Sequence, residues 1–337
     1  RTFSAPVTIA REVPREDLVF LAAKDDDPFA RYEAMQELMT GHLVAAVSGN
    51  LAADERDAGS ADIAEAMRSV LEDDRIDDLM RGELMSMPGQ TYVAEQMLAA
   101  DPGRIHKERE ALKADIGTRL RDELHDLYDR AERVPYSLDA EAKGARKVKT
   151  LVLGYAAASD PEKAAELASH QYEGANNMTD RQGALMVLAG LDSAERTHKL
   201  LDFYNRYRDN ALVIDKWFSL QASSLHPEAI EHVKALRDHP DFTLKNPNRV
   251  RSLYMAFAAN PTSFHAADGE GYRMIADLIL ELDPINAQTA ARFVPPLGRW
   301  RRIEEGRAKL MREALERIAA APKLSRDTFE QVTRSLG

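Results

Sequence analysis

The sequence predicts an all-α fold: an α-solenoid in which antiparallel helix pairs stack into a HEAT- or armadillo-like superhelix. The composition favours helices, because Leu, Ala, Glu, Arg and Met are abundant. Capping residues mark several helix starts along the chain. A helix-pair pattern recurs at a fixed spacing in the middle of the chain, which is typical of solenoids.

Composition and charge exclude several classes of protein. Apolar residues make up 44% of the 337 residues, which is enough for a large core, and the formal net charge is -11, which argues against general nucleic-acid binding. The absence of cysteine excludes a disulfide scaffold, a cysteine nucleophile and a cysteine-based zinc site, and fits a cytoplasmic location. No apolar run approaches the roughly 18 residues that a membrane span needs.

Residues 1–12 differ from the rest of the chain. Phe3, Ala5, Val7 and Ile9 alternate with polar residues, which predicts a short extended segment. A lone strand cannot bury itself, so this segment is expected to join a preceding small β-domain. From residue 13 to 337 the pattern is helical without a long linker, which predicts a single helical domain.

Helix starts are marked by cap residues followed by proline. Asp101-Pro102 and Asp160-Pro161 each combine an N-cap residue with Pro at the first helical position. Thr179 with Gln182 fits a capping box. Leucine and isoleucine at spacings of three and four predict one long amphipathic helix over residues 102–133.

A repeat runs through the middle of the sequence. Glu162, Glu195 and Glu228 are each 33 residues apart and lie near predicted helix starts. Second helices are expected at 179–191 and 211–223. Because each helix pair has an apolar face that it cannot bury alone, neighbouring pairs must stack to bury it.

The usual motifs of catalysis and metal binding are missing. None of the nine histidines begins an H-E-x-x-H motif, and His226 and His232 are six residues apart, whereas two zinc ligands on one helix are four apart. No metal site is therefore predicted. Walker, dinucleotide-binding and nucleophile-elbow motifs are also missing. The acidic runs 25–27 and 72–74 are interpreted as solvated loops.

Two basic stretches interrupt the acidic background. They contain Lys245, Arg249 and Arg251, and then Arg292, Arg299, Arg301 and Arg302. They are interpreted either as solvated helix faces or as an anion-binding patch, because guanidinium groups bind carboxylates with a fixed fork.

The helix after Asn246-Pro247-Asn248 separates two of these arginines. Residues two apart point about 200° apart on a helix, so Arg249 and Arg251 cannot face one site. One of them is expected to be structural and the other free. Trp217 is expected to pack in the core.

Several segments resemble the C-terminal domain of the bacterial aminopeptidase N (alanyl aminopeptidase) family. RTFSAPV at 1–7 looks like the junction after the family's small β-domain, and DPFARYEAMQEL at 27–38 looks like the first long helix of its C-terminal domain. Four further segments follow in the family's order: ANNMTDRQGAL at 175–185, VIDKWFSLQA at 213–222, FTLKNPNRVRSL at 242–253 and FHAADGEGY at 264–272.

The resemblance implies a zinc aminopeptidase with four domains that releases N-terminal residues from peptides. The zinc ligands and the general base belong to a preceding thermolysin-like domain, so this chain would hold no zinc and would be inactive alone. It would cap the catalytic chamber and restrict access to peptides. Its partners would be the catalytic and β-domains of the same polypeptide and peptide substrates, in a monomer.

The same resemblance nominates substrate-binding residues. Arg251 and Arg292 match arginines that reach into the family's chamber, where they would donate hydrogen bonds to the C-terminal side of the peptide. Arg249, Asn248 and Trp217 would support them structurally. The alternative is a stand-alone α-solenoid adaptor that binds a protein or peptide.

Overall fold

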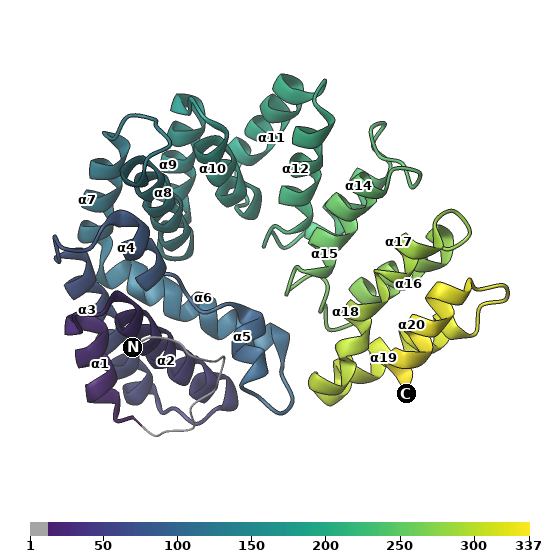
Figure 1. Cartoon of the computed structure of the whole chain (residues 1–337), viewed down its shortest axis with the longest axis horizontal. Helices are drawn as coiled ribbons and strands as arrows, with labels where there is room; N and C mark the ends of the chain where they lie inside the picture. Colours follow the sequence, from purple (N-terminus) through teal and green to yellow (C-terminus); the bar gives the residue numbers. More distant parts are fainter. Residues whose placement is uncertain (1–12) are drawn as a thin grey trace. The chain divides into compact units, whose positions relative to one another are not determined.

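The computed structural model describes residues 13–337, and every regular element in this range is helical (Figure 1). The backbone pairing outside helices is an isolated parallel bridge between Ala100 and Ile303. The all-α prediction is therefore confirmed for these residues, while the predicted extended segment 1–12 lies outside them. None of the helices in residues 13–337 combines the length and the apolarity that crossing a membrane would need.

The helices form two compact units. The first contains the described residues up to Gln96 together with Lys107–Val187, and the second contains Met97–His106 and Leu188–Gly337. The expectation that 13–337 is a single domain stays a prediction.

The first unit is built on helix α8, which packs against α4, α7 and α9. Its helices are α1 (Arg15–Lys24), α2 (Pro28–Ser48), α3 (Ala53–Leu71), α4 (Asp78–Leu84), α5 (Gln90–Glu95), most of α6 (Pro102–Arg119), α7 (Arg121–Glu132), α8 (Ala140–Ser159), α9 (Pro161–Gly174) and most of α10 (Met178–Gly190). Gly144 lets α8 approach α4 closely, because a Cβ there would lie 2.9 Å from the backbone nitrogen of Leu79.

The second unit continues the series of helices. They are α11 (Ala194–Tyr207), α12 (Ala211–Ala222), α13 (Ala229–Arg237), α14 (Pro247–Val250), the π-helical turn η1 (Arg251–Met255), α15 (Ala256–Ala258), α16 (Glu270–Leu282), α17 (Ala287–Ala291), α18 (Val294–Gly298), the 3₁₀ turn η2 (Arg299–Arg302), α19 (Glu305–Ala319) and α20 (Arg326–Leu336). Helices α14, η1 and α15 are continuous in sequence and form one helix with a wide turn in its middle.

The predicted repeat is present as helix pairs. Helices α9, α11 and α13 begin close to Glu162, Glu195 and Glu228, and the second helices α10 and α12 begin at Met178 and Ala211. Consecutive helices α11, α12 and α13 pack against one another. Their apolar faces are thus buried by neighbours in sequence, as a solenoid requires.

The prediction of one helix over 102–133 is wrong in one detail. The helix breaks at Leu120, whose φ of -114° and ψ of 21° leave the helical region, so that α6 and α7 are separate. The amide of Leu120 still bonds Ile116 at 3.0 Å, and the amide of Leu124 still bonds Leu120 at 2.9 Å. Because the apolar spacing continues through this break, the sequence pattern does not reveal it.

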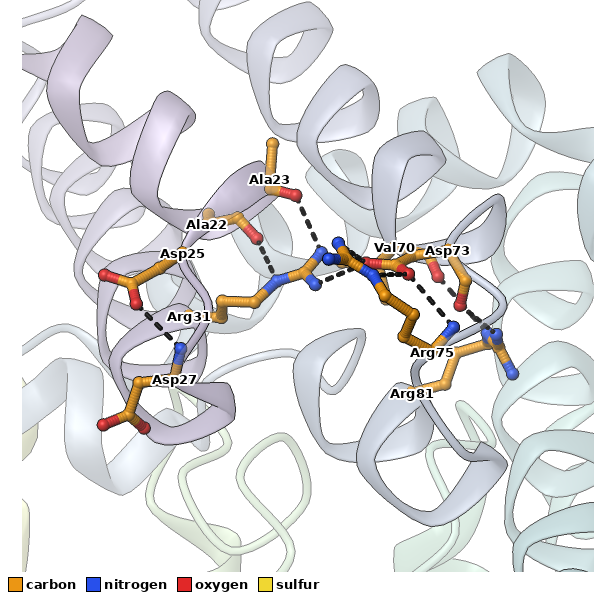
Figure 2. Close-up of polar contacts among 9 residues, drawn as sticks. All are labelled: Ala22, Ala23, Asp25, Asp27, Arg31, Val70, Asp73, Arg75 and Arg81. Carbon is orange, nitrogen blue, oxygen red and sulfur yellow. Dashed lines mark hydrogen bonds and ion pairs between the residues drawn. The ribbon is translucent and has the colours of Figure 1, made fainter.

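A buried arginine fixes the end of α1 in the first unit. Figure 2 shows Arg31, which is only 4% exposed, donating to the carbonyl oxygens of Ala22 at 3.1 Å and Ala23 at 2.8 Å. Its Nη1 reaches the carboxylate of Asp73 at 2.9 Å, and Arg75 binds the same carboxylate from the solvent side. Since carbonyls at a helix C-terminus lack partners within the helix, Arg31 caps α1 from α2.

A second buried arginine does the same for α3. Arg81 donates to the carbonyl oxygens of Val70 at 3.3 Å and Asp73 at 3.0 Å, and it forms an ion pair with Asp78 (Figure 2). The interpretation of 72–74 as a solvated loop is therefore wrong for Asp73, whose side chain is 11% exposed and carries an ion pair with Arg31.

The start of α20 is held by a carboxylate at the end of α16. Asp283 is 7% exposed and accepts from the backbone amide of Ser325 at 2.7 Å. It also accepts from the hydroxyls of Ser325 and Thr328. Burial opposes ionisation, but these hydrogen bonds outweigh it and lower the pKa of Asp283.

Candidate functional site

Arg249 is a structural residue in the second unit. Asn246 caps α14 by accepting from the amides of Asn248 and Arg249, which fixes the start of this helix. The side chain of Arg249 is buried, with Nε 2.7 Å from a carboxylate oxygen of Asp215 and Nη1 3.0 Å from the carbonyl oxygen of Asp241. All of these contacts are within the protein, so Arg249 ties α14 to α12.

Trp217 lies in the aromatic cluster beside this ion pair. It is 8% exposed, and its indole N–H donates to the carbonyl oxygen of Leu200 at 2.9 Å. Its ring centroid lies 5.1 Å from that of Tyr204 and 5.3 Å from that of His239. Its hydrogen bond ties α12 to α11, so the surroundings of Trp217 are those of a core residue.

Arg251 points away from this cluster. It is exposed and begins the π-helical turn η1. Its Nε donates to the carbonyl oxygen of Pro247 at 3.3 Å, and its Nη2 donates to the side-chain oxygen of Asn248. Asn248 thus orients the guanidinium along its own helix, and Arg251 forms no ion pair with another residue of 13–337.

Arg292 follows the last residue of α17 and is also exposed. Within residues 13–337 it has neither a hydrogen bond nor an ion pair. Helix α17 packs against α16 and α20, whereas η1 packs against α12 and α14, so the two arginines belong to different helix groups. Substrate contact by Arg251 and Arg292 stays a prediction.

A histidine cluster at the start of α13 was judged impossible from the sequence. Ligand atoms of His226, Glu228 and His232 lie within 4.8 Å of one another. The spacing argument assumed one helix through both histidines, but α13 begins at Ala229 and His226 lies in the preceding turn. The turn therefore brings His226 back towards His232.

The cluster does not fit a catalytic zinc ion. Nη2 of Arg196 lies 2.9 Å from Nδ1 and 3.2 Å from Nε2 of His232, so a fixed positive charge occupies the space beside the ring. Nδ1 of His226 already accepts from the amide of Glu228 at 3.1 Å. Burial, Arg196 and His226 together lower the pKa of His232 to about 4. These side chains form a packed polar contact.

The sequence analysis missed a basic pocket in the first unit. Lys143, Arg146 and Lys147 line it from α8, with Thr150 on the same face of the helix. The signal was the spacing of three and four residues, which puts cations on one helix face. The composition did not separate this stretch from the other charged helices.

Comparison with known proteins identifies the family. A family model described as a domain of unknown function (DUF3458_C) with ARM repeats matches residues 15–337. The chain is 38% identical over 341 residues to aminopeptidase N of Caulobacter vibrioides, a match that covers 100% of the chain and 39% of that protein. It is 34% identical over 335 residues to aminopeptidase N of Escherichia coli, covering 99% of the chain and 38% of that protein.

A solved structure agrees with these relatives. The crystal structure of Legionella pneumophila aminopeptidase A in complex with aspartic acid superposes with a TM-score of 0.88 at 28% identity, covering 99% of this chain and 40% of that one. The chain thus spans about two fifths of the length of its relatives. The ARM-repeat description confirms the predicted fold class, and the chain belongs to the DUF3458_C ARM-repeat family, which corresponds to the C-terminal part of aminopeptidase N.

Proposed function

We propose that this chain is the C-terminal helical domain of a zinc aminopeptidase that releases N-terminal residues from peptides. The observation that carries the proposal is the match to aminopeptidase N over the whole chain but only about two fifths of the relatives. The zinc, its ligands and the general base would belong to the rest of the polypeptide. When bound there, the metal would activate the water that attacks the peptide bond.

The proposed role of this domain is to cap the chamber and bind the far end of the peptide. Arg251 and Arg292 would donate charge-assisted hydrogen bonds to carbonyl or carboxylate oxygens of the substrate. Their exposure supports this role, because both guanidinium groups are free of carboxylate partners within residues 13–337. Arg249 contrasts with them, since its guanidinium is buried against Asp215.

Two peptide substrates would test the arginine contacts. In the full-length enzyme, Arg251→Ala should lower kcat/KM for a tripeptide by roughly 1–3 kcal/mol of transition-state stabilisation. The loss should be smaller for an alanine anilide, which has no C-terminal carboxylate. Arg326→Ala is the matched control, because Arg326 is exposed and pairs only with Glu330 on its own helix. Equal losses for both substrates, or no loss, would contradict the assignment.

The isolated chain provides a second test. With added zinc it should not hydrolyse an alanine anilide, because the histidine cluster beside Arg196 does not fit a catalytic metal. Zinc-dependent turnover by this chain would refute the proposal. We also propose a cytoplasmic location and a monomeric state, for which fractionation and sedimentation are the direct measurements.

A further inference from the structure

The basic pocket of the first unit has the size of a small-molecule site. Its volume is about 620 Å³, within the usual range for ligand pockets. Helix α8 supplies Lys143, Arg146 and Lys147, which lie on one side of the pocket. Leu138 and Leu151 add apolar walls. The pocket therefore combines positive charge with surface that could cover a carbon skeleton.

Arg146 is the unusual residue of this pocket. It is only 7% exposed, yet it has no hydrogen bond from its guanidinium and no ion pair within residues 13–337. Its closest recorded contact is with the ring of Tyr136, 5.1 Å from the guanidinium carbon to the ring centroid. Its nitrogens are not among the fully buried atoms that lack a partner, so they keep access to the pocket.

Every other cation buried to this degree in residues 13–337 has a carboxylate partner. The pairs are Arg31 with Asp73, Arg81 with Asp78, Lys149 with Asp180 and Arg249 with Asp215. A buried charge without a partner is strongly unfavourable, which is why such pairing is the rule. Arg146 departs from it at the wall of a pocket, where a bound anion would supply the missing charge.

The neighbouring charges reinforce this imbalance. Lys143 is exposed and forms no ion pair within residues 13–337. Lys147 pairs with Glu83 across the gap to α4. Asp139 is close enough to interact with Arg146 and Lys143, but its carboxylate caps α8 by accepting from the amide of Ala142 at 2.8 Å. The pocket thus retains positive charge in a chain whose net charge is -11.

We propose that this pocket binds a small, multiply charged oxyanion, a phosphate or polycarboxylate group, through Arg146 and Lys143. The guanidinium fork matches two oxygens of such a group, and the ammonium of Lys143 adds a second charge-assisted contact. The proposal is independent of the peptidase function, since Arg251 and Arg292 lie in the second unit and Arg146 in the first.

Calorimetric titration of the 337-residue chain at low ionic strength is the test, with inorganic phosphate, citrate and chloride as probes. Phosphate or citrate should bind, and chloride should not. Arg146→Gln should weaken binding at least about tenfold, and Lys143→Ala should weaken it several-fold. Arg326→Gln, which removes one exposed arginine from α20, should leave the affinity unchanged. Tighter binding of phosphate would identify a phosphate ligand, and tighter binding of citrate a polycarboxylate; both support the proposal.

The location can be checked by hydrogen exchange, in which the bound anion should slow exchange in α8. The proposal is overturned if neither oxyanion binds up to about 10 mM, if chloride binds equally well, or if Arg326→Gln weakens binding as much as Arg146→Gln. Should Arg146→Gln fail to fold, Lys143→Ala decides, because Lys143 is exposed and its substitution removes no partner.

Discussion

Replacing Arg31 by methionine should destabilise the first unit by about 3–5 kcal/mol, the cost of breaking a buried ion pair from one side. The structure supports this magnitude through three contacts of one side chain that is 4% exposed. Arg31 donates to Ala22 at 3.1 Å, to Ala23 at 2.8 Å and to Asp73 at 2.9 Å. Methionine fills most of the same volume, so the loss reports the polar contacts more than a cavity.

Arg75→Met is the matched control for this variant. Arg75 binds the same carboxylate of Asp73, but its side chain is 78% exposed. Exposed ion pairs contribute only about 0–1 kcal/mol, because water and salt screen them. The two variants therefore remove an arginine from one carboxylate at different depths, and burial alone predicts that the Arg31 variant is the less stable.

Acid should narrow the difference between wild type and the Arg31 variant. Hydrogen bonds from Arg75 and Arg31 hold the pKa of Asp73 well below its usual range. A depressed carboxyl pKa stabilises the fold above the unfolded value of about 3.9, and this stabilisation is lost as the pH falls towards the native pKa. Without Arg31 the native pKa is less depressed, so the loss in the variant stops at a higher pH.

Denaturant unfolding followed by far-UV circular dichroism at neutral and acidic pH measures these effects. Both tryptophans, Trp217 and Trp300, belong to the second unit, so hydrogen exchange of α1 and α2 is the better local probe. A loss below about 1 kcal/mol at pH 7, or an equal loss in Arg75→Met, would refute the reasoning that burial sets the strength of this contact.

Three further predictions concern the second unit. Arg249→Met should cost about 2–4 kcal/mol and Arg251→Met less than about 0.5, measured by tryptophan fluorescence in denaturant, because only the former breaks a buried pair; similar losses would contradict this. Burial lowers the pKa of His265 to about 4, so stability should fall as the pH drops from about 6.5 to 4, and His265→Phe should flatten that slope in urea titrations. Gly271→Ala should lower the melting temperature by several degrees, since its Cβ would lie 2.4 Å from the carbonyl oxygen of Phe264; an unchanged melting temperature would show that this backbone can shift.

The helical class and the helix starts could be predicted because their causes are local. Asp27 and Asp160 are N-cap residues followed by proline, and each side chain accepts from an amide in the first turn as its residue type suggests. The break at Leu120 could not be predicted, because the apolar spacing is continuous across it. Helix periodicity records which face is buried, and a short break of one residue changes that face very little.

The contacts that decide the candidate sites are non-local, and the sequence reveals them poorly. Helix geometry did predict that Arg249 and Arg251 point apart, and the structure buries the first and exposes the second. The pairing of Arg31 with Asp73, 42 residues away, has no local signature. The lack of a partner for Arg146 is harder still to predict, since it depends on where every nearby carboxylate lies.

The attachment of α20 through Asp283 has a consequence for how the last helix responds to salt. The carboxylate is bound by neutral donors, the amide and hydroxyl of Ser325 and the hydroxyl of Thr328, in a site shielded from water. Dissolved ions weaken attraction between exposed charges, such as Arg326 with Glu330, but have little access to a buried anion held by dipoles. The C-terminal helix should therefore remain attached in brines that dissolve the surface network of ion pairs around it.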